Sequence, residues 1–141
     1  MISVELLNNS NADDLNEVYT IWSRGYYGTS LEAFTTGLNN SNVIILVAKN
    51  AQSIVGISIL TFYLGHQMWS RGNHLCDIEC VRITDTSNYE EIAKKLYDMA
   101  TRISNDRGCI KTTITDFSDH RLFSALDLSY ERCYCEYHLT H

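Results

Sequence analysis

The chain has 141 residues and a formal net charge of −6, with 11 Lys and Arg against 17 Asp and Glu. A hydrophobic content of 45% and a charged content of 20% exclude a disordered or fibrous chain, and the length fits one domain, residues 1–141. No basic cluster stands out in the sequence, which argues against binding nucleic acid or an anionic membrane through a positive patch.

Residues 2–7 form a short strand candidate, and Ser10 or Asn11 can cap the helix that follows. That helix has one apolar stripe, made of Leu15, Val18, Tyr19 and Trp22, and we expect Trp22 to pack in the core. A second, shorter helix is predicted to start from a cap at Thr29 or Ser30.

Two apolar strands, residues 43–48 and 54–64, flank a tight turn, and a third strand covers residues 74–83. Simple alternation along the third strand predicts two faces, one with Leu75, Asp77, Glu79 and Val81 and the other with Cys76, Ile78 and Cys80. Two carboxylates between apolar residues are unusual for a core face. Asp77 and Glu79 are therefore candidate functional residues.

A cap within residues 84–88 begins the next helix, which ends at residues 105–108. A strand at residues 109–117, a short helix around residue 122 and a strand at 130–139 complete the order β-α-α-β-β-β-α-β-α-β. The helix between strands 74–83 and 109–117 predicts a right-handed crossover, which makes those strands parallel. The other strands form a meander, so the fold class is α/β or α+β with a mixed central sheet.

The sequence does not indicate a membrane-spanning protein, a secreted protein or a zinc protein. The apolar runs are too short or too interrupted to cross a bilayer as helices, and the first residues lack the basic and apolar regions of a secretory signal. The five cysteines are an odd number without a Cys-x-x-Cys pair, so a zinc site is not indicated. We expect a cytoplasmic protein with reduced cysteines and no bound metal.

The order of elements resembles that of the GCN5-related N-acetyltransferase (GNAT) family over essentially the whole chain. Four stretches carry the resemblance: NADDLNEVYTIWSRGY, SIVGISILTFYL, CDIECVRI and HRLFSALDLSYERCYCEYHL. They are similar to the family's opening helix, its xIVGxxxL strand, its acetyl-CoA-binding strand and its C-terminal pattern. The resemblance implies a single-domain GNAT-like fold in which strands 76–83 and 109–117 splay apart near Cys80 and Val81.

The resemblance also implies that acetyl-CoA is the acyl donor. The positions that match the family's donor site are Cys80, Val81, Ile83, Ser87, Asn88, Tyr89, Ile92, Ala93, Asp116 and Phe123. The phosphate loop departs from the family's glycine-rich pattern, because Asn88 replaces Arg or Gln and Tyr89 and Glu91 occupy small-residue positions. Added carboxylates in this segment predict weak binding of acetyl-CoA, although Ser87 and Asn88 can donate side-chain hydrogen bonds.

For the transfer itself, the resemblance implies a base and an acid. Asp77 and Glu79 are the candidate bases, since both lie on one strand beside the expected splay. The family's tyrosine that acts as the acid matches Phe123, which has no hydroxyl. Tyr130 or Tyr134 could stand in for it if one of them points into the slot.

Tyr26 and Tyr27 follow the first helix, in a region that often shapes the acceptor pocket in this family. The expected partner is a small-molecule or peptide amine, and the sequence does not indicate the oligomeric state. The alternative is a catalytically inactive GNAT-fold protein that works as a binding or regulatory module. The segment 84–93 discriminates the two, because exposed amides there favour the enzyme and carboxylates facing the slot favour the binder.

Overall fold

The computed structural model of the chain describes residues 1–24, 28–64, 74–115 and 121–126. Its elements are, in chain order, β1 (Ile2–Leu6), α1 (Ala12–Ser23), α2 (Leu31–Gly37), β2 (Val43–Asn50), β3 (Ser53–Leu64), β4 (His74–Ile83), the 3-10 turn η1 (Thr86–Asn88), α4 (Tyr89–Asp106), β5 (Cys109–Ile114) and α5 (Arg121–Ala125). Apart from η1, this is the predicted order, and the strand predicted at 130–139 lies outside the described residues.

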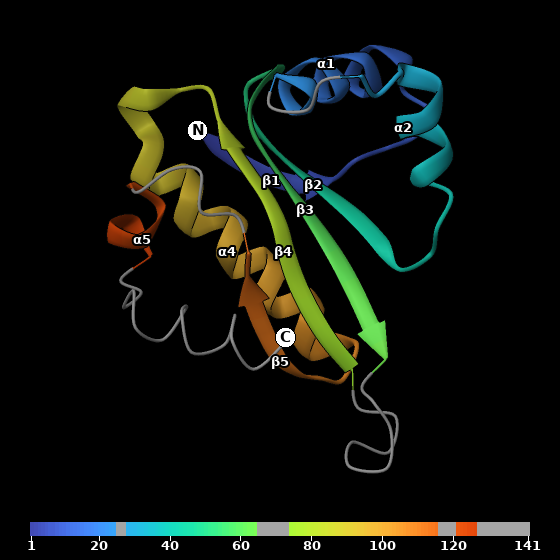
Figure 1. Ribbon diagram of the computed structural model, residues 1–141. Helices are drawn as coiled ribbons and strands as arrows, with labels where there is room; N and C mark the ends of the chain where they lie inside the picture. Colours follow the sequence, from blue (N-terminus) through green and yellow to red (C-terminus); the bar gives the residue numbers. More distant parts are fainter. Residues whose placement is uncertain (25–27, 65–73, 116–120, 127–141) are drawn as a thin grey trace.

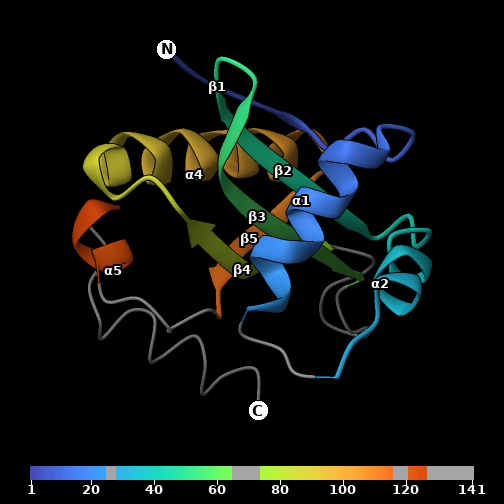
Figure 2. The same cartoon turned by 90° about the horizontal axis from the view of Figure 1, so that it is seen from above.

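The five described strands form one mixed sheet in the order β1-β2-β3-β4-β5. Neighbouring strands from β1 to β4 are antiparallel, and β4 and β5 are parallel, as the crossover through α4 predicts. Figures 1 and 2 show α1 and α2 on one face of the sheet and α4 and α5 on the other. The mixed α+β sheet expected from the sequence is confirmed.

Each face of the sheet has its own core. The α4-side core contains Leu60, Ile92 and Leu96, and the α1-side core contains Val18 and Ile57. Burial of these apolar side chains is the main stabilising contribution on either face.

The helix ends are determined by local sequence signals. The Asn11 side chain accepts a hydrogen bond from the Asp14 N–H at 3.1 Å, and the Ser30 hydroxyl accepts one from the Ala33 N–H at 3.1 Å. Gly108 has a φ of 75° and donates its N–H to the Asn105 carbonyl at 3.0 Å at the end of α4. Both predicted caps and the predicted C-terminal stop are therefore confirmed.

Helix α4 lies unusually close to β3. A Cβ atom on Gly56 would lie 2.8 Å from Cγ2 of Ile92, which is shorter than a normal carbon contact. The absence of a side chain at Gly56 therefore allows the first turns of α4 to pack directly on the sheet, next to the end of β4.

Strand β4 contains one extra residue relative to β3. Ile78 pairs with Leu60 and Cys80 pairs with Ile59, so Glu79 has no counterpart on β3. This arrangement is a β-bulge, in which two residues of one strand oppose one residue of its partner.

Because of the bulge, the faces of β4 differ from the simple alternation predicted for this strand. Cys76 and Ile78 belong to the α4-side core, but Cys80 belongs to the α1-side core. Val81, predicted to share a face with Asp77, packs against the α4-side core instead. The prediction holds through Glu79 and is wrong from Cys80 onward, because the extra residue exchanges the faces of the residues that follow it.

The parallel pairing of β4 and β5 is short. Its register runs from His74 opposite Cys109 to Ile78 opposite Ile114, and the Thr115 N–H donates to the Ile78 carbonyl at 3.1 Å. Strand β4 continues beyond this pairing to Ile83. Strand β5 ends at Ile114, whereas the sequence predicted it to residue 117; residues 116 and 117 lie outside the described part of the chain, so the separation near Cys80 and Val81 stays a prediction.

Candidate active site

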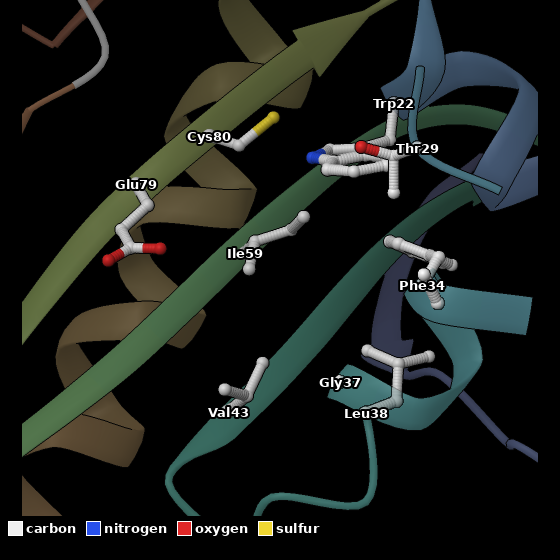
Figure 3. A pocket seen from close by; sticks show the side chains of 10 residues that line it. Trp22, Thr29, Phe34, Gly37, Leu38, Val43, Ile59, Glu79 and Cys80 are labelled. Atoms are coloured by element: carbon white, nitrogen blue, oxygen red, sulfur yellow. The ribbon is translucent and has the colours of Figure 1, made fainter. Parts of the chain in front are cut away.

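A cavity of about 320 Å³ opens on the α1-side face of the sheet, between the sheet and helices α1 and α2 (Figure 3). We call it the acceptor pocket, after the acceptor site that the family resemblance predicts next to the first helix. Its walls include residues of α1, α2 and three strands: Trp22, Phe34, Leu38, Val43, Ile59, Glu79 and Cys80. The bulge on β4 therefore places two consecutive residues, Glu79 and Cys80, at the same cavity.

One wall of the acceptor pocket is aromatic. The ring centroids of Trp22 and Phe34 are 4.7 Å apart, and those of Tyr19 and Phe34 are 5.6 Å apart. The Tyr19 hydroxyl donates to the Thr29 carbonyl at 2.5 Å, which ties the end of α1 to the segment before α2. Trp22 packs against the α1-side core as predicted, and its ring also lines the pocket.

Glu79 is the exposed carboxylate of the candidate site. Its Oε1 accepts a hydrogen bond of 2.7 Å from the Tyr63 hydroxyl. This hydrogen bond, with burial and the negative charge of Glu79, raises the pKa of Tyr63 to about 12, so the phenol keeps its proton at neutral pH. Sequence reasoning missed Tyr63, because only the pairing of β3 with β4 brings it to Glu79.

Asp77 is a buried carboxylate with a different environment. It is 7% exposed, and its two oxygens accept hydrogen bonds from the hydroxyls of Thr113 at 2.7 Å and Thr115 at 2.9 Å. Burial raises the pKa of Asp77, and the two threonine hydrogen bonds partly oppose that shift. The two candidate bases therefore differ, since Glu79 faces a cavity and Asp77 is held between β4 and β5.

In the segment before α4, the exposed side chains of Ser87 and Asn88 turn to a neighbouring carboxylate. Both donate to the carboxylate of Asp85, at 2.7 and 2.9 Å, and these bonds lower the pKa of Asp85. Three further predicted donor-site residues, Tyr89, Ile92 and Ala93, are buried in the α4-side core.

A second cavity, of about 560 Å³, lies at the end of β4 and is also lined by residues of α1 and α5. We call it the arginine cavity, because Arg24, Arg82 and Arg121 all line it, together with Val81 and Ile83. The guanidinium of Arg121 also lies over the ring of Tyr89, 4.5 Å from its centroid. The sequence did not indicate this positive patch, because its members are far apart along the chain.

Some predicted residues lie outside the described part of the chain: Tyr26, Tyr27, Asp116, Tyr130 and Tyr134. Phe123 is in α5, and its side chain is likewise not among those described. Within the described ranges, no group of His, Cys, Asp and Glu is arranged to hold a metal ion, and no helix is long and apolar enough to cross a membrane.

Solved structures share this fold. An aminoglycoside N-acetyltransferase in complex with CoA matches with a TM-score of 0.73 at 12% identity, over 92% of this chain and 88% of that one. A GNAT family acetyltransferase from Staphylococcus aureus matches with a TM-score of 0.66 at 18% identity, over 82% and 86%. A transcriptional regulator from Bacillus halodurans C-125 matches with a TM-score of 0.72 at 19% identity, over 92% and 94%.

A scan against protein-family models and a search of curated proteins give no match. The similarity is therefore one of structure, and it extends over most of this chain and of each neighbour. The chain has the GNAT fold, as its sequence predicted.

Proposed function

We propose that this protein is an acetyl-CoA-dependent N-acetyltransferase that transfers an acetyl group to an amine. The observation that carries the proposal is that one short segment of β4 borders two cavities. Glu79 and Cys80 line the acceptor pocket, and Val81, Arg82 and Ile83 line the arginine cavity. A transferase needs adjacent sites for its two substrates, and this segment lies beyond Ile78, the last β4 residue in the register with β5.

Glu79 is the proposed base. Its exposed carboxylate can accept a proton from an amine directly or through water, and Tyr63 holds one carboxylate oxygen in place. Asp77 is less suited, since both its oxygens already accept hydroxyl hydrogens and little of it is exposed. Glu79 first takes a proton from the ammonium group, which frees the lone pair of the nitrogen. The neutral nitrogen then bonds to the acetyl carbon, the carbon–sulfur bond of the thioester breaks, and the second proton of the nitrogen goes to the departing thiolate or to solvent.

The donor's phosphates are proposed to bind at the arginine cavity. Arginine forms charged, bidentate hydrogen bonds with phosphate oxygens, which suits Arg24, Arg82 and Arg121 to a polyanion. The loop before α4 fits phosphate less well, because the carboxylate of Asp85 lies there and accepts a hydrogen bond from each of the Ser87 and Asn88 side chains. When bound, acetyl-CoA supplies the activated acetyl group.

The test is a transfer assay with acetyl-CoA and a panel of amines, followed by release of free thiol and by the mass of the acetylated product. Glu79→Gln should lower kcat by roughly 10²–10⁴-fold, the usual effect of removing a positioned base. Glu17→Gln, an exposed glutamate on α1, is the matched control and should retain the parent rate. Transfer by the parent that Glu79→Gln leaves intact contradicts the assignment of the base.

A second candidate function is a binding or regulatory protein that has lost the transfer reaction. It is favoured by Asp85, which engages Ser87 and Asn88, and by Glu90 and Glu91 in the first turn of α4. One solved neighbour is described as a transcriptional regulator, so the fold also occurs under that description. Calorimetric titration with CoA separates the two, because absence of CoA binding and of transfer together favours this alternative.

A further inference from the structure

The acceptor pocket has an unusual balance of charge for a site that would take an amine. Among the described residues that line it, Glu79 is the only charged one, and most of the others are apolar: Trp22, Phe34, Leu38, Val43 and Ile59. A protonated amine placed here therefore meets a single carboxylate. Most of the remaining described lining is hydrocarbon or aromatic, with Thr29 and Cys80 as the polar exceptions.

The charged and aromatic parts of the pocket come from different sides. Figure 3 shows the Glu79 side chain on β4, with the side chains of Trp22 and Phe34 projecting from α1 and α2 across the pocket. An ammonium at Glu79 would thus have the rest of its molecule extending over Ile59 toward the aromatic wall. Aromatic walls favour flat rings, because stacked or edge-to-face ring pairs gain stability beyond their buried area.

The volume of the pocket also restricts the ligand. At about 320 Å³ it lies at the small end of ligand pockets, which span roughly 300–1,000 Å³. A polycationic amine, such as a polyamine or an aminoglycoside, would place additional ammonium groups against the apolar walls. Burying a charge without a partner is costly, so such ligands are disfavoured.

We propose that the acceptor is a small primary monoamine that carries an aromatic ring, of the arylethylamine type. This inference rests on the proposed N-acetyltransferase function, since it names the substrate class of that same site. Glu79 binds the ammonium group, and Trp22 and Phe34 bind the ring. Trp22 is therefore a specificity-determining residue.

The experiment measures binding and turnover separately. Calorimetry or ligand-observed NMR compares 2-phenylethylamine with its uncharged analogue 2-phenylethanol, and with spermidine and sisomicin as polycations. The transfer assay then uses the same three amines with acetyl-CoA. The variants are Glu79→Gln, Trp22→Leu and, as a matched aromatic control on the opposite face of the sheet, Tyr97→Leu in α4.

We expect the parent to bind 2-phenylethylamine about three- to five-fold more tightly than 2-phenylethanol, which is the usual contribution of an exposed charge pair. Glu79→Gln should remove this difference in affinity. Trp22→Leu should weaken binding of 2-phenylethylamine about ten-fold, as expected for loss of one aromatic contact. Tyr97→Leu should leave binding unchanged, and thermal melting of each variant checks that it is folded.

The outcomes separate this inference from the proposed function. Transfer to sisomicin or spermidine with a higher kcat/KM than to 2-phenylethylamine overturns the inference and leaves the transferase proposal standing. Binding of 2-phenylethylamine that depends on Trp22 and Glu79, without transfer to any amine, supports the arylethylamine specificity of the pocket and contradicts the transferase proposal. Equal binding by the parent and Trp22→Leu, or no binding of 2-phenylethylamine, overturns the inference.

Discussion

Replacing Thr113 by valine tests the account of Asp77 as a buried carboxylate held between two strands. Thr113 is 5% exposed and donates its hydroxyl hydrogen to Asp77 Oδ1 at 2.7 Å. Valine keeps the shape and the strand preference of threonine but removes this donor. A hydrogen bond to a charged group contributes roughly 1.5–3 kcal/mol, and little water can reach Asp77 to replace it. We expect Thr113→Val to lower the free energy of unfolding by about 2 kcal/mol at pH 7.

Thr115→Val is the matched control, since Thr115 donates to the other oxygen of Asp77 at 2.9 Å but is exposed. Water can take the place of its hydroxyl, so this variant should cost about 0.5 kcal/mol or less. Urea denaturation followed by tryptophan fluorescence measures both. With the usual slope of roughly 1–3 kcal/mol per molar urea, the Thr113→Val midpoint should fall by about 1 M.

The loss of unfolding free energy in Thr113→Val should also depend on pH. Burial raises the pKa of Asp77 and the hydrogen bond from Thr113 lowers it, so Thr113→Val raises that pKa further. A carboxyl whose pKa is higher in the folded state destabilises that state as it ionises. The cost of Thr113→Val should therefore grow as pH rises through the raised folded-state pKa of Asp77, and it should be smaller at pH 4.5 than at pH 7. Equal costs for the two valine variants, or a larger cost at pH 4.5, would refute the reasoning.

Three other perturbations have defined outcomes. Gly56→Ala should cost about 1–3 kcal/mol in urea denaturation, because its Cβ would lie 2.8 Å from Ile92; an unchanged midpoint would show that α4 shifts freely. Tyr63→Phe should lower kcat up to about ten-fold with little change in KM, because Glu79 loses the donor that orients it; an unchanged kcat excludes this positioning role. Arg82→Gln should weaken CoA binding about ten-fold in calorimetry. The variant should retain the parent's transfer rate with acetyl-pantetheine, a donor that lacks the phosphates, and an equal loss with both donors counts against a phosphate contact.

Features determined by nearby residues were predictable from the sequence. The caps at Asn11 and Ser30 and the stop at Gly108 depend on side chains and backbone within a few positions. The parallel pairing of β4 and β5 follows from the single helix between them, through the handedness of crossovers. Glu79 could be named as a candidate because a carboxylate among apolar strand residues is visible without the partner strands.

Features that depend on distant segments were not predictable. The bulge at Glu79 exists only relative to the register of β3, so alternation along β4 alone assigned Cys80 to the wrong face. Tyr63 meets Glu79 through that same register. Arg24 and Arg121 come together because α1 and α5 both approach the end of β4, and no spacing in the sequence encodes this.

The bulge also has an evolutionary consequence. Glu79 has no counterpart on β3, so deleting its codon would leave Ile78 and Cys80 adjacent, with each still facing the core that it faces now. Val81 would keep its place as well. One insertion into a regular strand is thus enough to add the pocket's carboxylate without repacking either layer. The carboxylate that we propose as the base can therefore be gained or lost through a single-codon change, independently of the selection that maintains the cores.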